Sequence, residues 1–185
     1  MDALTLANQL TLLRMLLIPA FVILVVYGHL GWALTTFVTA GVTDGLDGLI
    51  ARRWGKKTKL GAWLDPMADK LLLVTTFVVL TWPGLGLANR LPIWLTVLVI
   101  SRDVVIVLTV AVVNLAVGHR TFRPSTYGKV ATAVYILTCV AVMYFNYLER
   151  VSLLVDVCIY ASLAITLISS LHYALNVARV VNEGA

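Results

Sequence analysis

The chain has 185 residues, of which 61% are hydrophobic and only 12% are charged, and its mean hydropathy is +0.95. This balance excludes an ordinary soluble domain, in which about 45–50% of residues are apolar and about 25% are charged. The composition therefore predicts an integral membrane protein. The formal net charge of the chain is +5 at pH 7.

Apolar windows recur along the whole chain. Each has about 20 residues, enough for a helix to cross about 30 Å of hydrocarbon. Helices satisfy their own backbone groups in lipid, and no alternating ten-residue pattern indicates a barrel. The sequence therefore predicts an all-α polytopic membrane protein with six transmembrane helices, at residues 9–28, 31–53, 60–82, 91–117, 128–147 and 152–177.

The start of the first window has a second interpretation. In ALTLANQLTLLR, residues 3–14, Asn8 and Arg14 would share a polar side, so this part is also a candidate N-terminal segment lying along the interface. Asp2 and the lack of a small-residue cleavage pattern argue against a removable signal peptide. Short loops without low-complexity linkers predict one domain over residues 1–185.

The distribution of Lys and Arg predicts the orientation, because cytoplasmic loops carry the excess of positive charge. A cytoplasmic N-terminus places two cations outside, Arg90 and Arg150, and ten inside: Arg14, Arg52, Arg53, Lys56, Lys57, Lys59, Arg120, Arg123, Lys129 and Arg179. These inside charges suit anionic lipid head groups or a phosphorylated substrate, although they could also do no more than fix the topology. Nucleic acid is not an expected partner.

Four of the nine acidic residues, Asp44, Asp47, Asp65 and Asp69, lie within 26 positions in the second and third windows. Their spacings of three and four place each pair on one helical face. The loop between the windows is short, so two antiparallel helices would bring both pairs together. Four oxygen donors without nearby Cys or His predict Mg²⁺ or Mn²⁺, with an ion-pair cluster as the alternative.

The segment DGLDGLIARRWGKKTKLGAWLDPMAD resembles the signature of the CDP-alcohol phosphatidyltransferases, D-x2-D-G-x2-A-R-x8-G-x3-D-x3-D. The agreement covers every fixed position: Asp44, Asp47, Gly48, Ala51, Arg52, Gly61, Asp65 and Asp69. NQLTLLRMLLIPAF before it, and ISRDVVIV and RPSTYGK after it, also look like family segments. The resemblance therefore extends over nearly the whole chain.

This resemblance implies an enzyme that moves a phosphatidyl group from CDP-diacylglycerol to an alcohol and releases CMP. It implies six spans, a homodimer and two metal ions per site. The metal ligands would be Asp44, Asp47, Asp65 and Asp69, and Asp69 would also be the general base for the acceptor hydroxyl. The donor site would comprise Asn8, Asp44, Gly48, Ala51, Arg52 and Gly61. Close helix packing would also explain the small residues among them.

Two acceptors compete, phosphatidylglycerol in cardiolipin synthases and glycerol 3-phosphate in phosphatidylglycerophosphate synthases. The later family segments favour cardiolipin synthase. The residues predicted to bind the acceptor or its phosphate are Arg102, Arg120, Arg123 and Lys129. The alternatives are a salt bridge that locks helix packing for Arg102 and topology alone for the other three.

Two other classes of protein also place carboxylates in membrane helices. A cation-coupled transporter would be expected to carry them near the midplane, and a prenyltransferase on two distant segments. Here one block of acids adjoins a basic loop. The expected location is a bacterial inner membrane, with the active site facing the cytoplasm.

Overall fold

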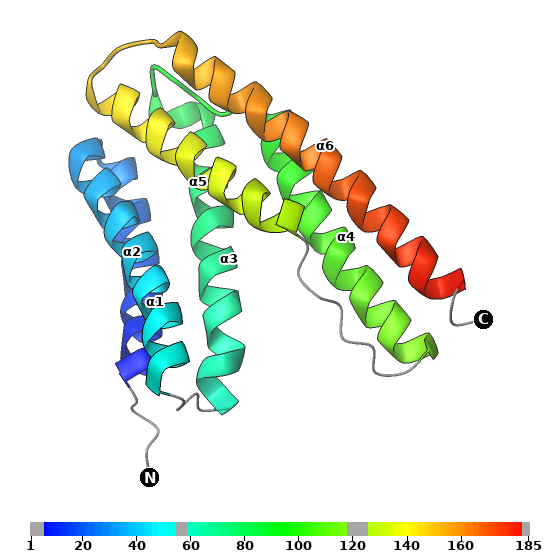
Figure 1. Ribbon diagram of the computed structural model, residues 1–185. Coiled ribbons are helices and arrows are strands. Elements are labelled where there is room, and N and C mark those ends of the chain that lie inside the picture. The colour runs from blue at the N-terminus through cyan, green and yellow to red at the C-terminus, as the bar shows by residue number, and fades with distance from the viewer. Residues whose placement is uncertain (1–5, 55–58, 118–125, 183–185) are drawn as a thin grey trace. The chain divides into compact units, whose positions relative to one another are not determined.

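The computed structural model describes residues 6–54, 59–117 and 126–182, and regular structure in these ranges is helical. The α-helices are α1 (Leu6–Val26), α2 (Leu30–Trp54), α3 (Lys59–Thr81), α4 (Ile93–Val117), α5 (Thr126–Tyr147) and α6 (Leu153–Asn182), with a 3-10 turn η1 (Pro83–Leu85) (Figure 1). Each α-helix coincides with one predicted window. The all-α prediction is therefore confirmed for the described residues.

Three helices contain a stretch long and apolar enough to cross a membrane: Ile93–Val110, Thr126–Tyr147 and Leu153–Ala178. Among the described residues, the apolar stretches of the first three helices are shorter: Thr11–Val26, Leu30–Thr43 and Lys70–Thr81. The described residues thus carry three candidate spans, and six spans stay a prediction.

The helices fall into two compact units. Unit 1 comprises Met1–Arg90 and Val142–Val151, and so contains α1, α2, α3 and the end of α5. Unit 2 comprises Leu91–Ala141 and Ser152–Ala185, and so contains α4, the rest of α5 and α6. The single domain expected over residues 1–185 stays a prediction.

In unit 1, α1 packs against both α2 and α3 (Figure 1). Phe21 on α1 and Phe37 on α2 are buried, and their ring centroids lie 6.0 Å apart. Ala33 and Ala40, about one turn to either side of Phe37, are completely buried. These small residues allow the α2 backbone to lie close to its neighbours, as membrane helices commonly require.

The helices α1 and α5 end in the same kind of turn. Each has the two backbone bonds of a Schellman motif, 2.8–3.0 Å long: Gly28 N to Val25 O, His29 N to Leu24 O, Glu149 N to Asn146 O and Arg150 N to Phe145 O. The left-handed residues are Gly28, with φ of 77°, and Glu149, with φ of 53°. Glycine is usual at this position because a Cβ atom crowds the backbone. Glu149 is therefore an exception.

In unit 2, buried hydroxyl groups join α5 to α6. The Tyr135 hydroxyl lies 2.6 Å from Thr166 Oγ1, and Thr138 Oγ1 lies 2.8 Å from Ser162 Oγ. All four side chains are buried. Lipid tails are as apolar as a leucine side chain, so burial of apolar surface does not drive helices together in a membrane. Hydrogen bonds and close packing hold them together instead. These contacts therefore position α6 against α5.

Candidate functional site

The signature residues lie on two consecutive helices of unit 1. Asp44 and Asp47 belong to the second half of α2, and Asp65 and Asp69 to the first half of α3. Only residues 55–58 separate the two helices, so the facing helix ends are at most about 18 Å apart. The side chains of the eight signature residues lie outside those that the structure describes.

The helix bounds place the four aspartates at two matching depths. Asp44 is ten residues from the loop end of α2, and Asp69 is ten residues from the loop end of α3. Asp47 and Asp65 are seven and six residues from the same ends. At about 1.5 Å per residue, these positions are about 15 Å and about 9–11 Å from the loop. Because α2 and α3 run in opposite directions (Figure 1), the matched depths suit one shared site.

A buried arginine lies on the helix that packs against both α2 and α3. Arg14 and Thr11 on α1 are 0% exposed. Arg14 therefore lies on a covered side of α1, and the location of residues 3–14 along the interface stays a prediction. The physical reason is that α1 is one continuous helix from Leu6 to Val26, and its neighbours cover the face that carries Thr11 and Arg14.

A buried guanidinium is stable only when charged or polar groups compensate it, and replacing one partner of a buried pair is strongly destabilising. We expect Arg14→Met to lower the free energy of unfolding by about 3 kcal/mol. Thermal unfolding of the purified protein in detergent measures the effect. Leu16→Met is the matched control, because Leu16 is on the same helix and is 70% exposed. Equal stability of Arg14→Met and wild type would contradict the expected contribution of the guanidinium.

Arg102 on α4 makes contacts within unit 2. Its Nη1 donates to Asp103 Oδ1 at 2.7 Å, and its Nη2 donates to Ser169 Oγ on α6 at 2.5 Å. The Arg102 side chain is 9% exposed. These bonds tie α4 to α6, which pack against each other (Figure 1), and so favour the interpretation as a packing lock. A role for Arg102 in acceptor binding stays a prediction.

The other predicted binding residues are placed only in part. Lys129 lies on α5 and is exposed. Asn8 lies on α1, but its side chain is outside those that the structure describes. Arg120 and Arg123 lie outside the described residues. Their roles therefore stay predictions.

Near the start of α5, a contact between two rings joins α5 to α6. The sequence did not predict this contact. The ring centroids of Tyr127 and His172 lie 4.6 Å apart. His172 Nε2 lies 3.0 Å from Asn176 Nδ2, one turn further along α6. The spacing of four between His172 and Asn176 was visible in the sequence, but their partner on α5 was not.

The described side chains do not themselves form a metal centre. Among them, no group of three or more His, Cys, Asp or Glu residues is arranged to hold a metal ion. The four signature aspartates are not part of that set. Carboxylates supply the oxygen donors that hard divalent cations prefer, so the chemistry of these four residues fits such ions.

A comparison with protein families decides the assignment of the chain. Residues 4–171 match the family model described as CDP-alcohol phosphatidyltransferase. The chain belongs to this family. The resemblance inferred from the signature is thereby confirmed, and the match includes all of α1 to α5 and the first part of α6.

Named relatives include both expected branches of the family. A Mycobacterium tuberculosis protein, "Probable phosphatidylglycerophosphate synthase", is 40% identical over an alignment of 131 residues, which covers 66% of this chain and 57% of that protein. The human "Cardiolipin synthase (CMP-forming)" is 32% identical over an alignment of 199 residues, which covers 97% of this chain and 64% of that protein. The Streptomyces coelicolor "Cardiolipin synthase (CMP-forming)" is 35% identical over an alignment of 135 residues, which covers 70% of this chain and 60% of that protein. The chain thus spans less than two thirds of each of these relatives.

Proposed function

We propose that the protein transfers a phosphatidyl group from CDP-diacylglycerol to the hydroxyl of a glycerol-containing acceptor and releases CMP. The observation that carries the proposal is the complete signature, placed at the adjoining ends of α2 and α3 within the family match. The names of the relatives support the same reaction, since they describe a phosphatidylglycerophosphate synthase and CMP-forming cardiolipin synthases.

The proposed metal ligands are Asp44, Asp47, Asp65 and Asp69, which would hold Mg²⁺ or Mn²⁺, two ions per site. Their oxygen-donor chemistry and the matched depths of the two pairs support the assignment. When bound, the ions neutralise the diphosphate of the donor and stabilise CMP as it leaves.

The residues of the chain supply binding and proton transfer. Asn8, Asp44, Gly48, Ala51, Arg52 and Gly61 form the proposed donor site. Arg52 suits the diphosphate because a guanidinium can bind phosphate oxygens with two donors. Gly48, Ala51 and Gly61 leave space for the nucleotide.

The transfer is a displacement at the phosphorus that carries the diacylglycerol. The acceptor oxygen forms a bond to this phosphorus, and the bond from phosphorus to the oxygen bridging the two phosphates breaks. The proton of the acceptor hydroxyl passes to the Asp69 carboxylate, which acts as general base. CMP leaves with the bridging oxygen, so no covalent intermediate on the enzyme is required.

The proposed setting is a bacterial inner membrane, crossed by six helices of each protomer in a homodimer. Three candidate spans and the density of Lys and Arg near the signature support this topology, with the site at the cytoplasmic surface. A diacyl donor would keep its tails in the bilayer while its diphosphate reaches the helix ends. Substrate and site then lie at the same depth.

Phosphatidylglycerol is the proposed acceptor, which makes the protein a cardiolipin synthase. The segments ISRDVVIV and RPSTYGK support it, and so does the alignment with human cardiolipin synthase over 97% of this chain. The 40% identical relative named as a probable phosphatidylglycerophosphate synthase favours glycerol 3-phosphate as the second candidate. Arg102, Arg120, Arg123 and Lys129 are the proposed acceptor-binding residues for either one.

An assay with both acceptors separates the two branches. Purified protein is supplied with CDP-diacylglycerol and either phosphatidylglycerol or glycerol 3-phosphate, and the lipid products are identified by mass spectrometry. We expect cardiolipin from phosphatidylglycerol. Product formed only from glycerol 3-phosphate would contradict the cardiolipin assignment while leaving the transferase reaction intact.

A further inference from the structure

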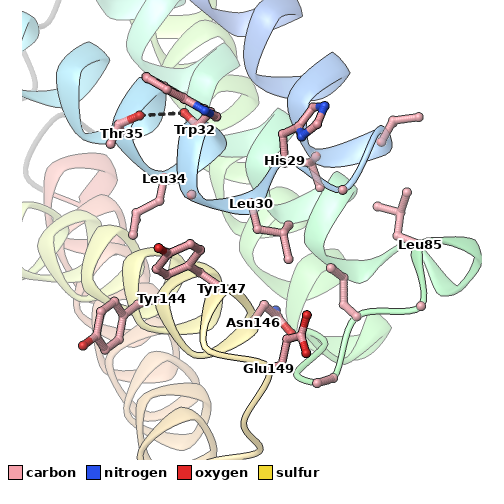
Figure 2. A pocket seen from close by; sticks show the side chains of 17 residues that line it. His29, Leu30, Trp32, Leu34, Thr35, Leu85, Tyr144, Asn146, Tyr147 and Glu149 are labelled. Atoms are coloured by element: carbon pink, nitrogen blue, oxygen red, sulfur yellow. Dashed lines mark hydrogen bonds between the residues drawn. The ribbon is translucent and has the colours of Figure 1, made fainter.

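A cavity of about 1050 Å³ opens at the end of unit 1 that lies away from the signature (Figure 2). It is lined by the turn between α1 and α2, the start of α2, residues 85–88 and the end of α5. Leu30 lines it and lies fourteen residues before Asp44 on α2, which is about 21 Å along the helix. The cavity is therefore separate from the proposed catalytic end.

Hydrogen bonds fix one wall of this cavity. Asn146 Oδ1 accepts a bond from the Asn89 backbone amide, and Asn146 Nδ2 donates to the Asn89 carbonyl, both at 2.7 Å. Asn89 Nδ2 also donates to the Arg150 carbonyl at 2.7 Å. Asn89 and Asn146 are buried. The segment of residues 85–88 is thus held to the end of α5, so the wall is formed before any ligand arrives.

A glycine positions one of the aromatic rings of the cavity. A Cβ atom on Gly31 would lie 2.9 Å from Tyr147 Cε2 and 3.1 Å from its Cδ2. Such a contact is too close, so a glycine at residue 31 allows the Tyr147 ring to lie against the α2 backbone. Figure 2 shows the Tyr144 and Tyr147 side chains, from the end of α5, on the same side of the cavity.

Glu149 places a carboxylate at this site at an energetic cost. Among the described residues, it is the only non-glycine with a positive φ. The matching turn after α1 has Gly28 at the same position, and Gly28 also lines the cavity. A glycine at residue 149 would relieve the backbone, so the strained glutamate indicates a use for its side chain.

The lining has the charge and the rings that suit a cation. Among the described residues that line it, Glu149 is the one with a carboxylate, and none is Lys or Arg. Trp32, Tyr144 and Tyr147 line it and are 71%, 47% and 57% exposed. Aromatic faces attract ammonium groups, and Trp and Tyr at helix ends are typical of the membrane–water interface.

The rest of the lining suits hydrocarbon. Leu30, Leu34 and Leu85 line the cavity, and Leu34 lies one turn deeper along α2 than Leu30 (Figure 2). A ligand that matches both parts has a cationic group at the membrane surface and an apolar body below it. Lipids with an ammonium head group have this form.

We propose that this cavity binds a phospholipid with an ammonium head group, from the leaflet opposite the signature residues. The ammonium group lies against the Glu149 carboxylate and the rings of Tyr144 and Tyr147, and the acyl chains follow Leu30 and Leu34. An anionic phospholipid lacks the cation and is repelled by Glu149. The site therefore selects a lipid other than the proposed acceptor or its anionic product.

Native mass spectrometry of the full chain tests this site. The protein is released from nanodiscs that contain equal amounts of phosphatidylethanolamine and phosphatidylglycerol, and the retained lipids are counted. Glu149 is exposed. We expect wild type to retain phosphatidylethanolamine preferentially, and Glu149→Gln to bind it about fivefold more weakly, near the upper end for the loss of an exposed charge pair. Retention of phosphatidylglycerol should not fall.

Glu149→Gly separates loss of the carboxylate from unfolding. Glycine suits the left-handed turn, so this variant should unfold at the same or a higher temperature than wild type and still lose phosphatidylethanolamine. Asp156→Asn removes an exposed carboxylate in the first turn of α6, outside the cavity lining, and should leave lipid retention unchanged.

Equal retention of phosphatidylethanolamine by wild type, Glu149→Gln and Glu149→Gly would overturn the proposal. Preference of wild type for phosphatidylglycerol would overturn it too. A shift from dimer to monomer in the Glu149 variants, with lipid retention unchanged, would instead assign the cavity to a contact between copies of the chain.

Discussion

Asp69→Asn is expected to lower the rate of CMP release by about 10³-fold, within the range that a general base contributes to catalysis. The amide cannot accept the proton of the acceptor hydroxyl, and it is also a weaker ligand for a divalent cation than a carboxylate. The substitution keeps the shape of the side chain, so α3 should remain folded. CMP release is measured by chromatography with saturating CDP-diacylglycerol and phosphatidylglycerol.

Two further variants make this result specific. Asp65→Asn should lose turnover to a similar extent, because it removes a proposed metal ligand from the same site. Asp156→Asn, which changes an exposed residue on α6, should keep wild-type turnover. Turnover retained in both Asp69→Asn and Asp65→Asn, with folding confirmed by circular dichroism, would refute the proposed site.

Removal of divalent cations is expected to lower the rate of CMP release at least as much as Asp69→Asn does. Treatment with EDTA should reduce CMP release to background, since the diphosphate and the leaving CMP would lose their main charge stabilisation. Added Mg²⁺ or Mn²⁺ should restore the rate. Zn²⁺, which prefers nitrogen and sulfur ligands, should restore it poorly.

The metal dependence also reports on single ligands. Asp47→Asn should raise the Mg²⁺ concentration for half-maximal rate by about tenfold or more, as substitutions at metal sites commonly do. A rate that is unchanged after EDTA treatment, with the ion content of the protein verified by elemental analysis, would contradict a metal-dependent transfer.

The helices were predictable because the property that defines them is local. An apolar window of about 20 residues is a local signal for a helix, because backbone groups in lipid must form their hydrogen bonds within the segment. The positions of the four aspartates near the adjoining ends of two helices were predictable for a similar reason, and their union in one metal site stays a prediction. Their spacing and the short link between α2 and α3 constrain their positions strongly.

Features that depend on distant contacts were not predictable. The covered face of α1 is one example, because an apolar helix gives little indication of which side its neighbours occupy, and the burial of Arg14 followed from that packing. The bonds between Asn89 and Asn146 join residues 57 positions apart. The bond from Arg102 to Ser169 likewise joins α4 to α6.

The turn at Glu149 could not be predicted for a different reason. Glycine after a helix is a signal for a left-handed cap, and Gly28 carries that signal. Glutamate carries none. Its conformation became visible only with the backbone bonds that close α5.

The fate of the lipid-linked phosphate tests the central claim most directly. CDP-diacylglycerol labelled with ³²P at this phosphate is incubated with the purified protein, Mg²⁺ and phosphatidylglycerol, and the products are separated. The proposed displacement predicts that the label enters the lipid product, with one unlabelled CMP released for each transfer. Label found in CMP, in phosphatidate or in free phosphate, or CMP release that does not depend on the acceptor, would contradict it.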